Sequence, residues 1–106
     1  IVALRNAKLN KVSDKVFINF ADLDSFKPKR KFDIVIANLF SGILIEKSDN
    51  ICRFLKTNKM ARIILSGILN NQANSVINCY LRQGMRLVRR LTVNDWTTLE
   101  FAKSES

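Results

Sequence analysis

The chain of 106 residues contains no histidine, and that absence excludes several kinds of site. Without an imidazole there is no Ser-His-Asp triad, no Cys-His pair and no histidine ligand for zinc. The two cysteines, Cys52 and Cys79, stand too far apart in the sequence to form a metal-binding pair. We therefore expect no metal site, and we expect both thiols to be reduced side chains on the apolar faces of helices.

Long apolar runs and clustered glycines are missing as well. No stretch approaches the ~18 apolar residues of a membrane span, and no basic segment followed by an apolar one opens the chain as a secretory signal. These features predict a cytoplasmic protein that does not enter a membrane. The three glycines, at positions 42, 67 and 84, do not form the GxGxG-like cluster that lets a backbone approach a nucleotide cofactor. The length allows one domain.

Acidic residues are scarce, and the formal net charge is +9. Such a charge raises the possibility of nucleic-acid binding. The basic residues are dispersed, however, and no aromatic residues alternate with them to stack on bases. We expect at most weak, non-specific contact with RNA. Two groups stand out among the basic residues: Lys27, Lys29, Arg30 and Lys31, and then Arg86, Arg89 and Arg90.

The segment 32–39 is the most informative part of the sequence. Ile34, Val35, Ile36 and Ala37 form an uncharged, mostly β-branched run, which predicts a strand buried on both faces of a parallel sheet. Asn38 follows at the carboxyl end of this strand, where ligands bind in open α/β sheets. Its amide can donate and accept hydrogen bonds. The alternative is that Asn38 is an ordinary turn residue.

The remaining pattern predicts alternating strands and helices. Hydrophobic periodicity and breaking residues indicate these segments: the end of a helix over 1–10, strands over 16–20 and 62–66, helices from 41 or 42 to 55 and over 71–83, and a final antiparallel pair of strands over 86–93 and 97–101. Gly84 would end the second of the two full helices. We expect Tyr80 to lie in the core with a hydrogen-bonded hydroxyl, and Trp96 to pack against the last helix.

Several short motifs occur in an order that resembles the bacterial ribosomal protein L11 methyltransferase family. No single motif is specific, but together they extend over nearly the whole chain. They are Asn6-Ala7-Lys8-Leu9-Asn10, Ala37-Asn38-Leu39, Ser66-Gly67-Ile68-Leu69 followed by Gln72 and Tyr80, and Asp95-Trp96. The break at 57–59 departs from the family, because the glycines usual there are absent.

The resemblance implies a Rossmann-like class I methyltransferase fold that is incomplete. The first two strands and the glycine-rich loop are missing, so residues 1–106 would form the C-terminal portion of a single catalytic domain. The missing strands would separate the strands 16–20 and 32–37, leaving backbone groups unpaired at a cost of about 1–3 kcal/mol each. We expect one of three outcomes: the two strands pair directly, the exposed edges associate between chains, or the chain is marginally folded.

The resemblance also implies an S-adenosylmethionine-dependent N-methyltransferase that acts on lysine or N-terminal amino groups of a large-subunit ribosomal protein. Asn38 would be catalytic, since its oxygen would orient the incoming amine. Asp22, Asn38 and Leu39 would contact the cofactor, with Asp22 near the adenine amino group. Leu39 and Phe40 would line the pocket. The isolated chain would be inactive, because half of the cofactor site is missing.

Plainer interpretations stay open for these residues and for the whole chain. Asp22 is equally well explained as a solvated loop or helix-cap acid, and Leu39 and Phe40 as core residues. Ser66 and Gly67 would shape the loop beside the pocket, and a plain strand-ending turn explains them at least as well. The whole chain has two alternatives: a non-catalytic methyltransferase remnant, or a basic RNA-binding α/β domain. RNA binding would weaken steeply with salt.

Overall fold

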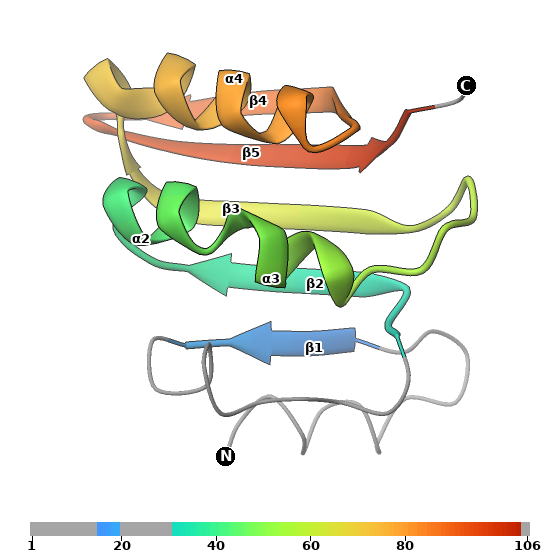
Figure 1. Ribbon diagram of the computed structural model, residues 1–106. Coiled ribbons are helices and arrows are strands. Elements are labelled where there is room, and N and C mark those ends of the chain that lie inside the picture. Colours follow the sequence, from blue (N-terminus) through green and yellow to red (C-terminus); the bar gives the residue numbers. More distant parts are fainter. Residues whose placement is uncertain (1–14, 20–30, 105–106) are drawn as a thin grey trace.

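A computed structural model describes residues 15–19 and 31–104 of the chain. Its centre is a five-stranded sheet in the order β1-β2-β3-β5-β4 (Figure 1). The first three strands run parallel, and β5 and β4 are antiparallel additions. The strands are β1 (Lys15–Ile18), β2 (Ile34–Asn38), β3 (Arg62–Leu69), β4 (Met85–Val93) and β5 (Trp96–Lys103).

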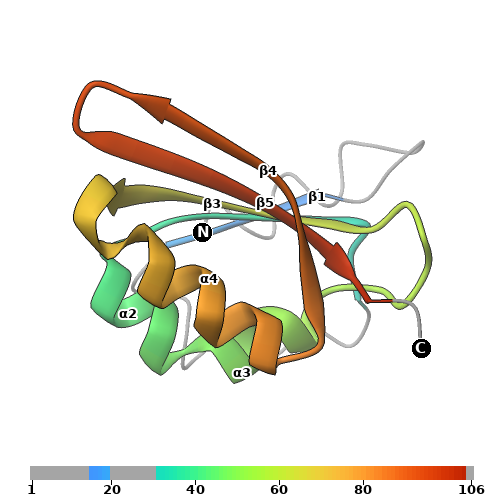
Figure 2. The ribbon, with the colours of Figure 1, turned by 90° about the horizontal axis from the view of Figure 1, so that it is seen from above.

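Within the described residues, three helices pack on one side of this sheet (Figure 2). They are α2 (Ser41–Glu46), α3 (Ser48–Arg53) and α4 (Ala73–Arg82), and the short 3-10 turn η2 (Asn70–Gln72) precedes α4. The alternation of helices and strands therefore gives the expected α/β architecture. The helix expected over 1–10 lies outside the described residues.

Strands β1 and β2 pair directly, so the first of the three expected outcomes is confirmed. Their register is parallel, and Val16 pairs with Val35 and Ile18 with Ala37. All four side chains are buried on the helix side of the sheet. The pairing gives the backbone of both strands hydrogen-bond partners and buries apolar side chains at the same time.

The expectation that β2 is buried on both faces is wrong. Val35 and Ala37 are buried, whereas Ile34 and Ile36 are only half-buried. Successive side chains of a strand point to opposite faces, and the described helices cover one face alone (Figure 2). An uninterrupted apolar run therefore does not prove two covered faces.

The helix expected from 41 or 42 to 55 is two helices separated at Lys47. Lys47 ends α2 and precedes α3, with φ −102° and ψ 18° outside the helical region. The break lets α2 bury Leu44 while α3 buries Ile51 and Cys52 in the same core. Periodicity does not reveal this break, because both segments keep apolar residues on the side that faces the sheet.

Tyr80 joins α4 to two other elements, as expected for a core residue with a polar tip. Its side chain is fully buried, and its hydroxyl donates a hydrogen bond of 2.8 Å to the carbonyl of Leu44. Its ring stacks on Phe101 of β5 with centroids 5.3 Å apart. The expectation for the two cysteines is also confirmed, because Cys52 and Cys79 are buried free thiols on α3 and α4.

The C-terminal hairpin has the expected pair of strands, both longer than predicted. The turn between β4 and β5 contains Asn94, whose φ of 55° lies in the left-handed region that asparagine tolerates. Asn70 holds this turn: its amide nitrogen donates to the carbonyl of Asn94 at 2.8 Å, and its amide oxygen accepts from the hydroxyl of Thr97 at 2.7 Å. The turn stands away from the helices (Figure 2).

Candidate functional site

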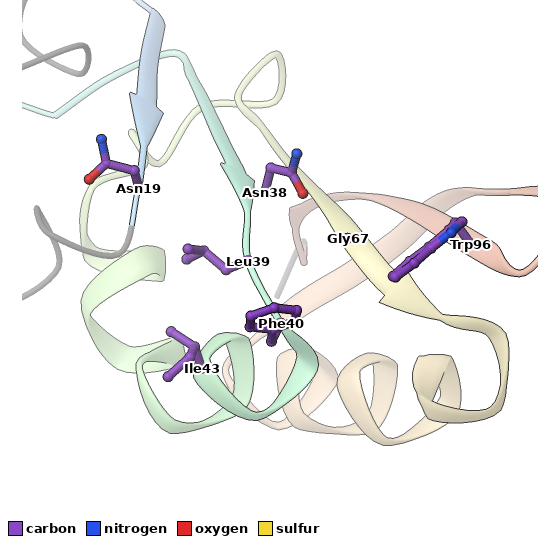
Figure 3. Close-up of a pocket in the computed structure, with 7 residues that line it drawn as sticks. All are labelled: Asn19, Asn38, Leu39, Phe40, Ile43, Gly67 and Trp96. Atoms are coloured by element: carbon purple, nitrogen blue, oxygen red, sulfur yellow. The ribbon is translucent and has the colours of Figure 1, made fainter.

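A pocket of about 650 Å³ opens at the edge of the sheet where the parallel strands end. Because β1, β2 and β3 are parallel, their carboxyl ends meet at this edge, the usual ligand position in open α/β sheets. The lining residues come from β2, β3, β5, α2 and the loop segments after β1 and β2 (Figure 3): Asn19, Asn38, Leu39, Phe40, Ile43, Gly67 and Trp96.

Gly67 gives Asn38 its place in this pocket. Strand β3 has an irregular register between Leu65 and Ile68, and Gly67 lies there with φ +83°. A Cβ atom at Gly67 would lie 2.5 Å from Oδ1 of Asn38 and 3.1 Å from the carbonyl oxygen of Leu39. The side chain of Asn38 therefore occupies space that only a glycine leaves open.

The backbone beside this contact is held by β3. The N–H of Leu39 donates to the carbonyl of Ser66 at 3.2 Å, and Asn38 pairs with Ser66 in the sheet register. Ser66 and Gly67 thus shape the pocket edge, as expected, although β3 continues through them to Leu69 instead of ending at residue 66. Leu39 is buried and lines the pocket, so it serves both the core and the site.

Two aromatic residues form exposed parts of the pocket wall. Phe40 is 78% exposed and Trp96 is 49% exposed. Figure 3 shows Asn38 and Trp96 on either side of Gly67. The expectation that Trp96 packs against the last helix is wrong, because Trp96 begins β5 and pairs with Leu69 of β3. The plain core interpretation of Phe40 is also wrong, given its exposure.

The structure thus brings together four residues singled out in the sequence: Asn38, Leu39, Phe40 and Gly67. Asp22 lies outside the described residues. The sequence interpretation missed Asn19 as well as Trp96. Asn19 directly follows β1, so the strand-end rule that found Asn38 applies to it equally.

The described lining is largely apolar, with two neutral carboxamides as its polar side chains. Such a combination of apolar walls and a few polar groups is typical of small-molecule sites.

Within residues 15–19 and 31–104, no three His, Cys, Asp or Glu side chains gather into a group that could hold a metal ion. None of the helices in this part of the chain is long and apolar enough to cross a membrane.

Comparison with known proteins gives consistent results. The family model described as "Ribosomal protein L11 methyltransferase (PrmA)" matches residues 1–104. Among curated proteins, the ribosomal protein L11 methyltransferase of Ruminiclostridium cellulolyticum is 32% identical over 101 residues, covering 94% of this chain and 31% of the relative. That of Bradyrhizobium diazoefficiens is 35% identical over 106 residues, covering 96% and 35%. The chain thus spans about a third of the length of these relatives.

Solved structures show the same fold. The ribosomal protein L11 methylase of Lactobacillus delbrueckii has a TM-score of 0.68 at 20% identity, covering 78% of this chain and 41% of that one. A putative methyltransferase from Thermoplasma acidophilum has a TM-score of 0.63 at 12% identity, covering 77% and 43%. The sheet and its helices are therefore part of a class I methyltransferase fold.

Proposed function

Because this chain belongs to the ribosomal protein L11 methyltransferase family, we propose that it forms the C-terminal portion of the single catalytic domain of a protein N-methyltransferase. The methyl donor would be S-adenosylmethionine, and the acceptors would be lysine or N-terminal amino groups of a large-subunit ribosomal protein. A cytoplasmic location follows from such a substrate. The observation that carries the proposal is the position of Asn38, held over Gly67 inside the pocket.

The volume and the described lining of the pocket support its being one part of the proposed cofactor site. Its volume of about 650 Å³ lies within the roughly 300–1,000 Å³ of ordinary ligand sites. Asn38 and Leu39 would contact the cofactor from the end of β2, where Gly67 makes room for the side chain of Asn38. Asp22 is proposed for the adenine amino group. When bound, the sulfonium supplies an electrophilic methyl group with its own leaving group.

The chain's own residues would orient the acceptor amine. The carboxamide oxygen of Asn38 can accept a hydrogen bond from an amine N–H, which fixes the direction of the nitrogen lone pair. The same oxygen stabilises positive charge as it develops on that nitrogen. The apolar side chains of Leu39, Phe40 and Trp96 would reduce the contact of a bound amine with water and so favour its neutral, nucleophilic form.

The test is Asn38→Ala in the complete protein that contains this chain, with ribosomal protein L11 and labelled S-adenosylmethionine as substrates. We expect kcat to fall on the order of a hundredfold, as misplacement of a reactant does. Folding should be preserved, because Asn38 is exposed at a strand end. The matched control is Asn78→Ala, which removes an exposed asparagine of α4 away from the pocket lining.

Two results would contradict this proposal. Full turnover by the Asn38→Ala variant would remove Asn38 from the chemistry, and no methyl transfer by the wild-type complete protein would remove the proposed activity. The isolated chain, which has no glycine-rich cluster, is expected to be inactive. Weak, non-specific RNA contact stays a prediction, to be checked by the salt dependence of binding to ribosomal RNA.

A further inference from the structure

We propose that Asn70 is a positioning residue, which holds Trp96 in the wall of the pocket and so sets the space beside Asn38. Its effect on methyl transfer rests on the proposed function, whereas the placement of Trp96 can be measured without any activity. Asn70 is not one of the described lining residues, and Trp96 is. Asn70 would therefore act on the site through Trp96.

Hydrogen bonds from Asn70 reach the residues on both sides of Trp96. The backbone N–H of Asn70 donates to the carbonyl of Asp95 at 3.0 Å, and its side-chain oxygen accepts from the hydroxyl of Thr97 at 2.7 Å. Its side-chain nitrogen donates to the carbonyl of Asn94 at 2.8 Å. Asn70 thus holds the turn before Trp96 and the residue after it.

The bond to Thr97 bears most directly on the indole. Thr97 is buried, and neighbours in a strand point to opposite faces, so a fixed Thr97 also fixes the direction in which Trp96 projects. A buried hydroxyl needs a hydrogen-bond partner. The hydroxyl of Thr92 lies 3.4 Å from that of Thr97, a longer contact than the one to Asn70.

Trp96 needs this support because it lies at a corner of the sheet. Its partner Leu69 is the last residue of β3, and its partner Val93 is the last residue of β4. Strand pairing therefore continues from Trp96 in one direction only. In the described part of the chain 49% of Trp96 is exposed, so side-chain packing supplies only part of what fixes it.

An irregularity separates this corner from the regular part of the sheet. Leu65 pairs with Leu99 and Ile68 with Thr97, so two residues of β3 stand opposite one residue of β5 between these pairs. Such a bulge disrupts the ladder locally and bends the strand. The regular pairing beyond the bulge therefore does not set the position of Trp96 by itself.

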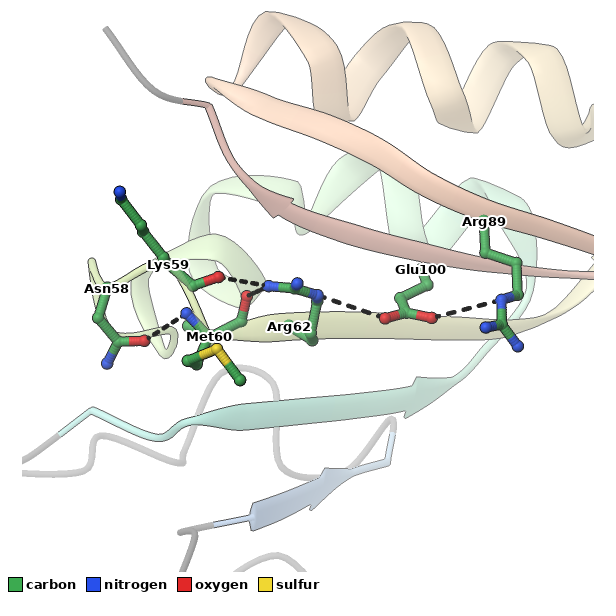
Figure 4. A network of polar contacts seen from close by, with 7 residues as sticks. Asn58, Lys59, Met60, Arg62, Arg89 and Glu100 are labelled. Atoms are coloured by element: carbon green, nitrogen blue, oxygen red, sulfur yellow. Dashed lines mark hydrogen bonds and ion pairs between the residues drawn. The ribbon is translucent and has the colours of Figure 1, made fainter.

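A second polar contact holds β5 on the far side of the bulge. Glu100 lies between two arginines, with its oxygens 3.4 Å from Nε of Arg62 on β3 and 4.0 Å from Nε of Arg89 on β4 (Figure 4). This contact ties the same strands together but lies on the other side of the bulge from Trp96. It offers a comparison in which β5 loses a tether that is not next to the pocket.

The position of Trp96 matters for the site because of what lies beside it. Figure 3 shows Asn38 and Trp96 on either side of Gly67. A displaced indole would widen the space in which Asn38 would orient the acceptor amine. The expected consequence is a less well aligned amine and slower methyl transfer.

The first test follows Trp96 by fluorine NMR in the complete protein labelled with fluorotryptophan. The signal of Trp96 is the one that disappears in Trp96→Leu. Asn70→Ala, which keeps the backbone bond to Asp95, should shift or broaden this signal. Asn71→Ala removes the exposed carboxamide of the next residue and should leave the signal in place. Arg62→Met removes one partner of Glu100 and should also leave it in place, even though it loosens the far end of β5.

The second test measures methyl transfer to ribosomal protein L11 by the same variants. We expect Asn70→Ala to lower kcat roughly tenfold through misalignment of the amine, and Asn71→Ala to keep wild-type turnover. If Asn70 acts through Trp96, the double variant Asn70→Ala, Trp96→Leu should be no slower than Trp96→Leu alone. Circular dichroism should show all variants folded.

The outcomes separate this inference from the proposed function. A Trp96 signal that is unchanged in Asn70→Ala would overturn the inference, and so would an equal change in Arg62→Met or losses of kcat that simply add in the double variant. Wild-type protein that transfers no methyl group would contradict the proposed function instead. The fluorine signal would then still support or overturn the placement of Trp96 by Asn70.

Discussion

Replacing Gly67 by alanine tests the geometry of the pocket most directly. The backbone at Gly67 has φ +83°, and a left-handed conformation costs an L-residue about 1–2 kcal/mol. The new methyl group would also meet Oδ1 of Asn38 at 2.5 Å and the carbonyl oxygen of Leu39 at 3.1 Å. The first contact is closer than carbon and oxygen atoms tolerate, so the side chain of Asn38 must rotate away.

Gly84 provides a matched control for the backbone term. Its φ is +86°, and nothing lies within 4 Å of a Cβ built there. Gly84→Ala should therefore cost the same 1–2 kcal/mol or so of left-handed strain without a steric term. Gly67→Ala should cost about 1 kcal/mol more than Gly84→Ala, because the carbonyl of Leu39 belongs to the backbone and crowding in a packed region is unfavourable.

Two assays separate strain from function. Urea unfolding of the variants gives the free energies of unfolding, and methyl transfer by the complete protein gives kcat. Gly67→Ala should reduce kcat about as much as Asn38→Ala does, on the order of a hundredfold, whereas Gly84→Ala should leave it unchanged. Equal stability loss in the two variants, together with wild-type turnover in Gly67→Ala, would refute the close contact between Gly67 and Asn38.

Two further predictions concern the core. Tyr80→Phe keeps the stacked ring but removes the hydrogen bond that the hydroxyl donates to the carbonyl of Leu44. It should lower the free energy of unfolding by about 1–3 kcal/mol in urea titrations. A loss below 0.3 kcal/mol or so would contradict a buried hydrogen bond. Burial raises the pKa of Cys52 from 9.0 to about 12, so the unfolded chain loses this proton first as the pH rises. The contribution of Cys52 to stability should be constant below about pH 9 and fall between pH 9 and 12. The fall should be shallower for Cys52→Ala, and identical slopes would argue against the burial of this thiol.

The parts of the site that the sequence predicted are local in the chain. Asn38, Leu39 and Phe40 follow one apolar run, and Ser66 and Gly67 end a second one, so strand-end reasoning reaches them without any knowledge of packing. Direct pairing of β1 with β2 was one of three outcomes expected from the sequence. The backbone groups of both strands need hydrogen-bond partners, but this need does not specify which strand supplies them.

The missed features depend on contacts between distant segments. Trp96 joins the pocket because β5 pairs with β3, a partner that periodicity within residues 96–103 does not specify. The half-burial of Ile34 and Ile36 depends on which face the helices cover, which a uniformly apolar segment does not reveal. The break at Lys47 likewise reflects how α2 and α3 each fit the sheet.

The strand order also has a consequence for the time course of folding. The β4–β5 hairpin pairs residues that are close in sequence, whereas β2 pairs with β3, and β3 with β5, across long stretches of chain. Short loops close faster than long ones, so we expect the hairpin to form early and the parallel pairs late. The pocket takes Asn38 from β2, Gly67 from β3 and Trp96 from β5, so it is complete only after the slowest pairing. A partly folded chain would therefore present the hairpin but no binding site.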